Sequence, residues 1–349
     1  MREVRVCIVG MGIGRHNGRG FISNPRSRIV ALCDLLEDRM ADFAKELPGP
    51  VSLHTDYVKM AQDPEIDAIF VGTPNQYHVP VALEAIKNGK HVMVTKPLSD
   101  SVVAARTLVE AAEAAGVVNM MSLSTRFADE VQYLGQLARQ GDLGELYYAR
   151  ARSVRRIGIP AWSLGFIQKG GGAFRDMGVH VLDAVWWLLG MPTPVSVTGV
   201  AGAKFGPRGQ GYMGRPIAPI EEMARQYAAD DYAGGFIRFD NGVGLQVESF
   251  WASHQPGEFQ IELFGADAGA RLRPLTLYRT VNGAPQDATV QLPEKPGVTV
   301  WDALAEHFIA CILDGVPCAA PLRHGLIVQE MMEALLESAD RGREVALNV

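Results

Sequence analysis

An acid and an imidazole stand four residues apart after a run of three glycines, in the segment GGGAFRDMGVHVLD (170–183). If this segment is helical, Asp176 and His180 share one face, because residues i and i+4 are neighbours on an α-helix. Histidine titrates near neutral pH, so it can act as a general base that takes a proton from a reacting group. Asp176 can orient that imidazole or bind a neighbouring hydroxyl. Taken alone, such a pair is more often a surface or capping pair than a catalytic one.

A lysine occupies a second position at which chemistry can take place. Lys96 follows the apolar run HVMV (91–94), which is typical of a buried strand, and open α/β sheets bind ligands at the carboxyl ends of their strands. Its ammonium group can hold a reacting oxygen and stabilise negative charge that develops there. No third residue with metal-type spacing accompanies Asp176 and His180, so the sequence predicts no metal site.

A glycine cluster after the first apolar run is typical of a dinucleotide-binding turn. Gly10, Gly12 and Gly14 allow the backbone to approach a pyrophosphate at the start of a helix, where the helix dipole favours negative charge. Asp34 ends the second apolar run, where a ribose hydroxyl needs an acceptor. The third glycine stands one place earlier than in G-x-G-x-x-G, and Arg15 can face the phosphates. The cofactor contacts predicted here are Gly10, Gly12, Ile13, Gly14, Arg15 and Asp34.

The residue after Asp34 bears on the choice of cofactor. Leu35 offers no cation to a 2′-phosphate, and the Asp34 carboxylate would repel one. The sequence therefore favours NAD over NADP.

The first third of the chain alternates between strand-length apolar runs and segments with helical periodicity. Because the runs are apolar on both faces, they predict a parallel sheet covered by helices on both sides, which is a doubly wound α/β domain. We predict strands at 4–10, 28–34, 66–74, 91–97 and 117–123.

The pattern changes after residue 123. Alternating segments follow, including a hairpin with the turn signal Asn241-Gly242, and two helices close the chain from residue 301. This succession indicates an α+β domain with a large open, mostly antiparallel sheet. We predict a dinucleotide-binding domain at 1–123 and a substrate-binding and oligomerisation domain at 124–349.

Composition excludes several classes of partner. The net charge is −6 and no basic stretch persists, so we expect no nucleic-acid partner. No run approaches the ~18–20 apolar residues of a membrane helix. The N-terminus enters a β-branched run without the features of a signal peptide, so we expect a cytoplasmic protein. The four cysteines have no metal-type spacing and are interpreted as reduced core thiols, and His307 as a core histidine.

Five fragments in order give the chain a resemblance to a known family. They are VGTPNQYH (71–78), GKHVMVTKPL (89–98), RF (126–127), GGGAFRDMGVHVLD (170–183) and DYAGGFIRFDNG (231–242). Together they closely resemble the glucose–fructose oxidoreductase / inositol dehydrogenase (Gfo/Idh/MocA) family over essentially the whole chain.

The resemblance implies a Rossmann domain, an α+β domain whose open sheet forms a homodimer or homotetramer, and NAD(P)-dependent chemistry on a secondary alcohol of a sugar, glycoside or cyclitol. It assigns catalysis to Lys96, Asp176 and His180, and Lys96 is also expected to contact the cofactor. It also places a loop and helix start beside the nicotinamide, at Thr73, Pro74, Asn75 and His78. Where the family usually has Glu-Lys-Pro this chain has Thr95 before Lys96, which removes a possible counterion.

Arginine and tryptophan near the glycine run suit recognition of a polyol, because a guanidinium binds hydroxyls and an indole covers the C–H face of a sugar. We expect substrate contacts from Arg126, Arg156 and Trp162, with Arg155 beside them. Two other functions remain open: an NAD-dependent glycosidase that works by transient oxidation, and a cofactor-binding sensor without turnover. The sequence does not choose the sugar, glycoside or inositol.

Overall fold

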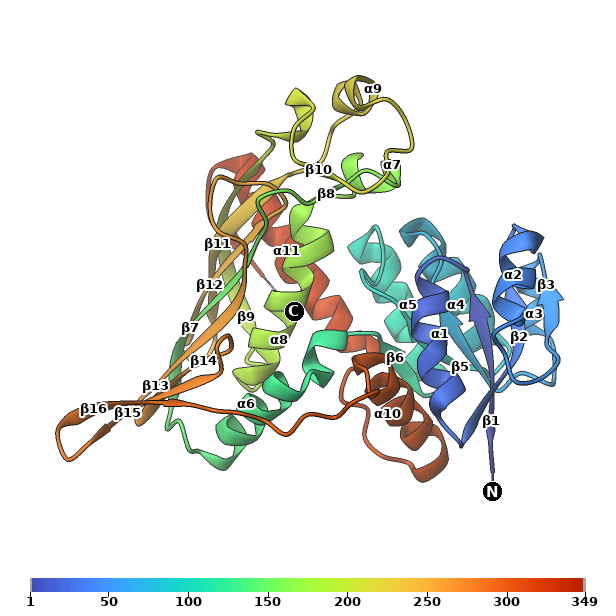
Figure 1. Ribbon diagram of the computed structural model, residues 1–349, viewed down its shortest axis with the longest axis horizontal. Helices are drawn as coiled ribbons and strands as arrows, with labels where there is room; N and C mark the ends of the chain where they lie inside the picture. Colours follow the sequence, from blue (N-terminus) through green and yellow to red (C-terminus); the bar gives the residue numbers. More distant parts are fainter. Residues whose placement is uncertain (1, 348–349) are drawn as a thin grey trace. The chain divides into compact units, whose positions relative to one another are not determined.

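The computed structural model describes residues 2–347, and the chain folds into two compact units (Figure 1). The first unit comprises Met1–Phe127 and Lys295–Leu326, and the second comprises Ala128–Glu294 and Ile327–Val349. Residues 295–326 thus return to the first unit, although the sequence placed them in the second domain. The sequence pattern identifies a helix there but carries no signal for the surface against which that helix packs.

The first unit contains a six-stranded parallel sheet with strand order β3-β2-β1-β4-β5-β6. This order confirms the predicted doubly wound fold. The sequence missed β3, which has only three residues and little burial. The strands are β1 (Val4–Val9), β2 (Ser27–Cys33), β3 (Ser52–His54), β4 (Ala68–Val71), β5 (His91–Val94) and β6 (Asn119–Met121).

Helices connect these strands, and a helix from the C-terminal return joins them. α10 (Val300–Asp314) begins with a capping box in which Thr299 and Asp302 bind each other's backbone amide groups. It packs on α1 so closely that a Cβ at Gly20 would lie 2.2 Å from the Trp301 carbonyl oxygen. The connecting helices are α1 (Ile13–Ser23), α2 (Glu37–Ala44), α3 (Tyr57–Ala61), α4 (His78–Lys87), α5 (Val102–Ala115) and the 3₁₀ turns η1 (Asn75–Tyr77) and η2 (Ser124–Phe127).

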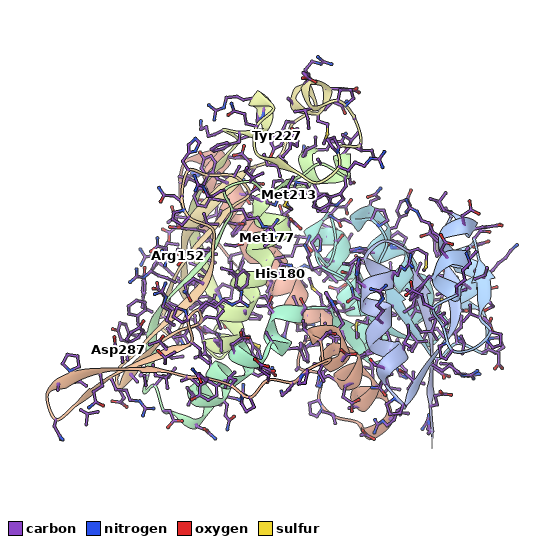
Figure 2. The ribbon with its side chains drawn as sticks, in the orientation of Figure 1. Arg152, Met177, His180, Met213, Tyr227 and Asp287 are labelled. Carbon is purple, nitrogen blue, oxygen red and sulfur yellow. The ribbon has the colours of Figure 1, made fainter. Side chains whose placement is uncertain are left out.

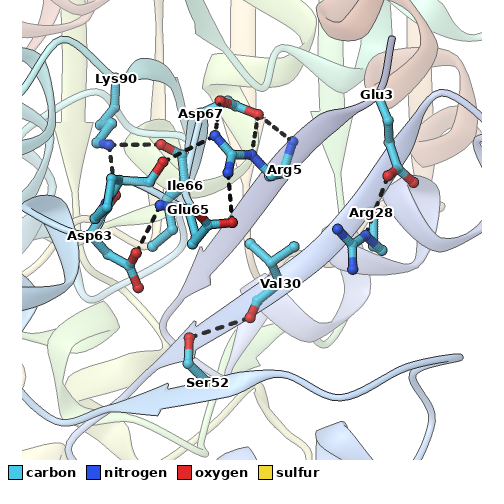
Figure 3. Close-up of polar contacts among 11 residues, drawn as sticks. Glu3, Arg5, Arg28, Val30, Ser52, Asp63, Glu65, Ile66, Asp67 and Lys90 are labelled. Carbon is cyan, nitrogen blue, oxygen red and sulfur yellow. Dashed lines mark hydrogen bonds and ion pairs between the residues drawn. The ribbon is translucent and has the colours of Figure 1, made fainter. Parts of the chain in front are cut away.

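Charged side chains at the amino ends of the strands bind one another (Figure 3). Arg5 donates through Nε and Nη2 to both carboxylate oxygens of Asp67, at 3.0 and 2.8 Å, and through Nη1 to Glu65. The ammonium of Lys90 donates to the carbonyl oxygens of Asp63 and Ile66, both at 2.7 Å. These charged groups form their hydrogen bonds with one another and with the backbone at the amino edge of the sheet. The predicted cofactor contacts and Lys96 lie at the opposite edge, at the carboxyl ends of the strands.

The second unit is built on a nine-stranded sheet of order β16-β15-β14-β13-β7-β12-β11-β9-β17. Only the pair β7–β12 is parallel, so the predicted open, mostly antiparallel sheet is confirmed. The strands are β7 (Leu146–Val154), β9 (Pro194–Gly202), β11 (Tyr232–Phe239), β12 (Gly244–Phe250), β13 (Glu258–Gly265), β14 (Ala268–Arg271), β15 (Thr276–Val281), β16 (Ala284–Thr289) and β17 (Val345–Ala346).

One face of this sheet carries the core and the other carries charged side chains. Along β7, Ala149 and Ala151 are buried, while Arg152 on the opposite face pairs with Glu258 and Glu262 at 3.3 and 3.5 Å. The helices whose side chains join the core are α6 (Asp129–Gln140), α8 (Val179–Leu188) and α11 (Leu322–Arg341). Alternating burial of this kind is what a sheet covered on one side requires.

The predicted hairpin joins β11 and β12. Gly242 adopts a positive φ of 85°, which favours glycine. The Asn241 side chain accepts a hydrogen bond from the Val243 amide at 3.2 Å, so asparagine contributes here through its side chain rather than through its backbone angle.

A separate small core lies under the long connections of the second unit, around Ile159, Met223 and Trp251. Figure 2 labels Met213 and Tyr227 in this part of the chain. Its short elements are α7 (Leu164–Ile167), β8 (Ile159–Pro160), β10 (Tyr212–Met213), η4 (Gly206–Arg208) and α9 (Ile220–Arg225). Among residues 2–347, no helix combines the length and apolar character needed to cross a membrane.

Candidate active site

The glycine turn at the carboxyl end of β1 can hold a phosphate group. Gly10 has a φ of 87°, and a Cβ there would lie 2.4 Å from the Gly72 carbonyl oxygen, so only glycine fits. A Cβ at Gly12 would meet nothing within 4 Å, which leaves open space before the start of α1. Gly14 is buried against Ile8, with its Cβ position 3.0 Å from the Ile8 side chain. The displaced third glycine therefore provides the close packing of helix on strand.

Asp34 lies beside this turn, at the end of β2. Its Oδ2 accepts a hydrogen bond from the Met11 amide at 2.6 Å, and its Oδ1 accepts one from the Leu36 amide at 3.0 Å. These bonds fix the carboxylate next to the glycine turn. Leu35, the next residue, is 80% exposed and gives this position an apolar neighbour.

Arg15 and Ile13 are also on the first turn of α1. The guanidinium of Arg15 forms an ion pair with Glu46 and lies 5.8 Å from the centre of the Phe43 ring. The expected contact of Arg15 with the phosphates stays a prediction. Ile13 is exposed and can contact a ligand at the turn.

The loop after β4 is tied to the segment that carries Lys96. The two ring nitrogens of His78 lie 2.8 Å from the carbonyl oxygens of Thr73 and Pro97, and the side chain is fully buried. Both ring nitrogens of His78 thus face backbone carbonyl groups, an arrangement that suits positioning of the loop, and the expected contact of His78 with the cofactor stays a prediction. Burial lowers the pKa of His78, while the two carbonyl groups act in the opposite direction.

Thr73, Pro74 and Asn75 lie on that loop, with Asn75 half-buried and Pro74 exposed. The Thr73 hydroxyl oxygen is buried and has no hydrogen-bond partner among residues 2–347. A buried unpaired hydroxyl is costly unless a ligand or water binds it. Together with the space at Gly12 and the Asp34 carboxylate, this hydroxyl fits a dinucleotide.

Lys96 follows β5 and is half-buried, two residues after the strand ends. The amide of the preceding Thr95 donates to the Val71 carbonyl oxygen at 3.0 Å, which continues the pairing of β5 with β4. The backbone that carries Lys96 is therefore held by hydrogen bonding at the carboxyl edge of the sheet, where the sequence predicted this residue.

In the second unit, Asp176 and His180 come from one helical stretch with an irregular start (Figure 2 labels Met177 and His180). Residues Phe174–Gly178 form a π-helical turn that continues into α8 at Val179. The sequence predicted an ordinary α-helix here. Both side chains are half-buried. A π-helical turn is wider than an α-helical turn and is frequent at functional sites.

A buried tryptophan orients Asp176. The indole Nε1 of Trp251, from the segment after β12, donates to Asp176 Oδ2 at 3.0 Å, and the Trp251 side chain is fully buried. Sequence reasoning missed Trp251. Its only signal was a large aromatic residue at the end of a predicted strand, and a strand pattern does not reveal which helix it faces.

The glycines before Asp176 form a turn that packs against an aspartate, Asp230. Gly172 has a φ of 113°, and a Cβ there would lie 1.9 Å from Asp230 Oδ1. The other oxygen, Asp230 Oδ2, accepts a hydrogen bond from the Phe174 amide at 2.9 Å. Burial raises the pKa of Asp230 to about 6. The close approach of Asp230 therefore requires glycine at position 172.

The predicted substrate residues fall into different surroundings. Trp162 is 47% exposed, and edge-to-face contacts link it through Phe166 to Trp251, with ring centres 5.8 and 6.4 Å apart. Arg155 reaches the residue after Asp176, because its Nη2 is 3.1 Å from the Met177 sulfur. Arg156 is exposed.

Arg126 belongs to the first unit, and its side chain is only 1% exposed. Its Nη1 donates to the Ala319 carbonyl oxygen at 2.8 Å and lies 3.0 Å from His324 Nδ1. This burial does not support the sugar contact that the sequence predicted for Arg126.

Comparisons with known proteins agree with this architecture. Residues 4–123 match the model described as "Oxidoreductase family, NAD-binding Rossmann fold", and residues 131–271 match the "GFO/IDH/MocA C-terminal domain". The chain is 30% identical to D-glucoside 3-dehydrogenase of Escherichia coli K12, over 99% of this chain and 97% of that protein. It is 27% identical to scyllo-inositol 2-dehydrogenase (NAD(+)) of Bacillus subtilis 168, over 76% and 72% of the two chains.

Among solved structures, levoglucosan dehydrogenase in complex with NADH and levoglucosan superposes with a TM-score of 0.85. It is 20% identical and covers 100% of both chains, which shows a shared fold. The matched models cover both units, and a curated relative aligns over nearly the full length. The chain therefore belongs to the Gfo/Idh/MocA family of oxidoreductases, whose N-terminal domain is an NAD-binding Rossmann fold.

Proposed function

We propose that this protein is an NAD-dependent dehydrogenase that oxidises a secondary ring hydroxyl of a sugar, glycoside or cyclitol. The observation that carries the proposal is the arrangement around Asp176. A half-buried carboxylate is held by the fully buried Trp251 indole, one helical turn before a half-buried histidine. A purely structural pair would not need a buried donor from another segment to fix one of its oxygens.

In this proposal, His180 takes the hydroxyl proton and Asp176 orients the imidazole or a neighbouring hydroxyl. Lys96 donates to the same oxygen and stabilises its negative charge as the C–H bond weakens. When bound, NAD supplies the hydride acceptor at C4 of its nicotinamide. The glycine turn, the Thr73 hydroxyl and the Asp34 carboxylate would hold it.

Cofactor choice follows from Asp34. The carboxylate lies beside the glycine turn and next to exposed Leu35, where it would bind a ribose hydroxyl, and the Bacillus subtilis relative is named as an NAD(+) enzyme. We expect Asp34→Ala to raise KM for NAD. We also expect the variant to prefer NAD over NADP less strongly, so that kcat/KM with NAD divided by kcat/KM with NADP falls. Asp38→Ala, an exposed acid on the first turn of α2, is the control for charge alone. An unchanged ratio in Asp34→Ala would contradict the assignment.

A glycoside or free sugar is the first substrate to test, because the relative aligned over the full chain is named a glucoside 3-dehydrogenase. Arg155 and Trp162 offer the guanidinium and indole that suit such a ring.

We also propose a homo-oligomer formed through the charged face of the second unit's sheet. A cytoplasmic location is consistent with four free thiols.

The test is a panel of glucosides, free sugars and inositols with NAD or NADP, read by the absorbance of the reduced nicotinamide. Lys96→Ala and His180→Ala should each lower kcat by ~10²–10⁴-fold, the usual contribution of proton transfer, while NAD still binds. Lys87→Ala, an exposed lysine on α4, is the control. Aglycone released without reduced nicotinamide would indicate the glycosidase, and no turnover on any substrate would indicate a sensor. Full activity in both variants would remove the site assignment.

A further inference from the structure

Three side chains that the sequence separates come together where α10 ends. His307 and Cys311 are four residues apart on α10, and Cys318 lies in the following loop. One ligand-type atom of each lies within 4.8 Å of the others, and Cys311 Sγ is 3.5 Å from His307 Nε2. Gly315 ends the helix with a φ of 69° and turns the chain back. Both cysteines are free thiols, as the sequence interpretation expected, and the structure adds that they lie in one cluster with His307.

The hydrogen bonds in the cluster favour thiol chemistry over a metal ion. His307 Nε2 accepts a hydrogen bond from the Ala319 amide at 2.8 Å, so the lone pair that would bind a metal is occupied. The described residues bring three candidate ligands together, whereas a closed structural zinc site has four.

The two thiols differ in exposure and in acidity. Cys311 is 5% exposed, and Cys318 is half-buried next to the exposed Val316 and Pro317. A hydrogen bond from the Cys311 thiol, an amide from Ala320 and the charge of Arg126 lower the pKa of Cys318 despite its burial. The hydrogen bond with Cys318, together with burial, raises the pKa of Cys311.

We propose that Cys318 and Cys311 form an oxidation site, in which a hydroperoxide oxidises Cys318 and Cys311 then closes a disulfide. The Cys318 thiolate attacks one peroxide oxygen, the O–O bond breaks, and the products are a sulfenic acid on Cys318 and hydroxide or an alkoxide. The Cys311 sulfur then attacks the Cys318 sulfur. An S–S bond forms, the S–O bond breaks, and the hydroxyl leaves as water with the Cys311 proton. The protein loses two electrons and two protons, and the peroxide is reduced.

The site differs from the other two cysteines in ways that make the test selective. Cys7 and Cys33 are buried in β1 and β2, and burial raises the pKa of both thiols, that of Cys33 to about 12. Thiolate character and exposure decide which cysteine a peroxide oxidises. Hydrogen peroxide should therefore spare both and react at Cys318.

The experiment treats the reduced full chain with hydrogen peroxide and follows free thiols, intact mass and the peptide map. We expect the four free thiols to fall by half, with a loss of two hydrogen atoms, no added oxygen and a Cys311–Cys318 cross-link that dithiothreitol reverses. Cys311→Ser should accumulate a sulfenic acid at Cys318 that dimedone traps. Cys33→Ser is the control and should still form the cross-link.

Other results would overturn the proposal. One is oxidation of Cys7 or Cys33 at the same rate as Cys318. Another is an uncross-linked sulfonic acid at Cys318 in the unaltered chain, a measurement that does not depend on whether a variant folds. A third is stoichiometric binding of Zn²⁺ by the reduced protein that is lost in His307→Ala, which would make the cluster a metal site.

Discussion

Asp176 illustrates how a single functional side chain depends on residues far away in the sequence. Its carboxylate accepts a hydrogen bond from the Trp251 indole. In the turn before it, Asp230 accepts a hydrogen bond from the Phe174 amide. Neither partner belongs to the segment that made Asp176 recognisable. At this scale the sequence identifies the residue that can react, and the surrounding strands determine its orientation.

Removal of the indole N–H should lower activity more than stability. In Trp251→Phe the aromatic contact with Phe166 can remain, but Asp176 loses its charge-assisted hydrogen bond, which is worth ~1.5–3 kcal/mol. We expect kcat/KM to fall by ~10–100-fold in steady-state assays. Trp186→Phe is the matched control, because that equally buried indole donates to the Pro192 carbonyl oxygen at 2.9 Å. Equal losses of activity in the two variants would contradict an orienting role for Trp251.

Asp230 should make stability depend on pH in a direction unusual for an aspartate. Burial raises its pKa from 3.8 to about 6, so the folded state binds a proton that the unfolded state releases. Its stabilising contribution is present below pH ~4 and is lost as the pH rises through about 6, a change of ~2–3 kcal/mol.

The measurement is the free energy of unfolding from denaturant curves at pH 4 and pH 7. The free energy of unfolding of Asp230→Asn, relative to that of the unaltered chain, should rise by ~2–3 kcal/mol from pH 4 to pH 7. The reason is that the asparagine amide does not ionise, whereas the aspartate does. Asp240→Asn, at an exposed position on the β11–β12 turn, should show no such gain. If the difference in unfolding free energy between Asp230→Asn and the unaltered chain were the same at pH 4 and pH 7, the pKa of Asp230 would not be raised by folding.

At the scale of elements, the main departure from expectation is the π-helical turn before α8. The pairing of Asp176 with His180 was argued from α-helical spacing, but the helix widens at Phe174–Gly178. The wider turn follows the Gly171–Gly172 turn, and Asp230 accepts hydrogen bonds from the Ala173 amide through its carbonyl oxygen and from the Phe174 amide through its carboxylate. The shape of this helix start therefore depends on the glycine turn and on the segment before β11.

Gly172→Ala should destabilise the second unit. An alanine there would be strained at a φ of 113° and would overlap Asp230 Oδ1, so we expect a loss of ~2–4 kcal/mol in the free energy of unfolding. Gly170→Ala is the matched control. Gly170 also has a positive φ, of 90°, but a Cβ there meets nothing within 4 Å. If both variants lost the same stability, contact with Asp230 would contribute nothing.

At the scale of the whole molecule, each unit is organised around one sheet, and the chain passes between the units more than once. The six-stranded sheet carries helices, including α10 from the C-terminal return. The nine-stranded sheet has its core on one face and ion pairs such as Arg152–Glu258 on the other. A stable protein interface buries ~1,200–2,000 Å² in total, and the charged face of this sheet is the surface that the proposed homo-oligomer would use.

Charge reversal on that face tests the proposed homo-oligomer. Arg152→Glu places three carboxylates together, because Arg152 lies 3.3 Å from Glu258 and 3.5 Å from Glu262. We expect the mass measured by light scattering to fall to that of one chain. Arg28→Glu creates a like-charge pair with Glu3 in the first unit and is the control. A chain that is monomeric before any substitution, or an oligomer that Arg152→Glu leaves intact, would contradict the proposal.

The sequence alone determined the features that depend on local pattern. Apolar runs alternating with helical periods predicted the parallel sheet, the alternation after residue 123 predicted the antiparallel one, and Gly10, Asp34 and Lys96 were located at strand ends. Burial and periodicity are written into neighbouring residues, so they can be recovered from one chain.

Tertiary structure decided which distant groups meet. It brought Trp251 to Asp176, turned both nitrogens of His78 to backbone carbonyl groups, buried Arg126, and gathered His307, Cys311 and Cys318. It also returned residues 295–326 to the first unit. Each of these contacts arises from the packing of elements that are far apart in the chain, and the periodicity within an element does not specify its partner.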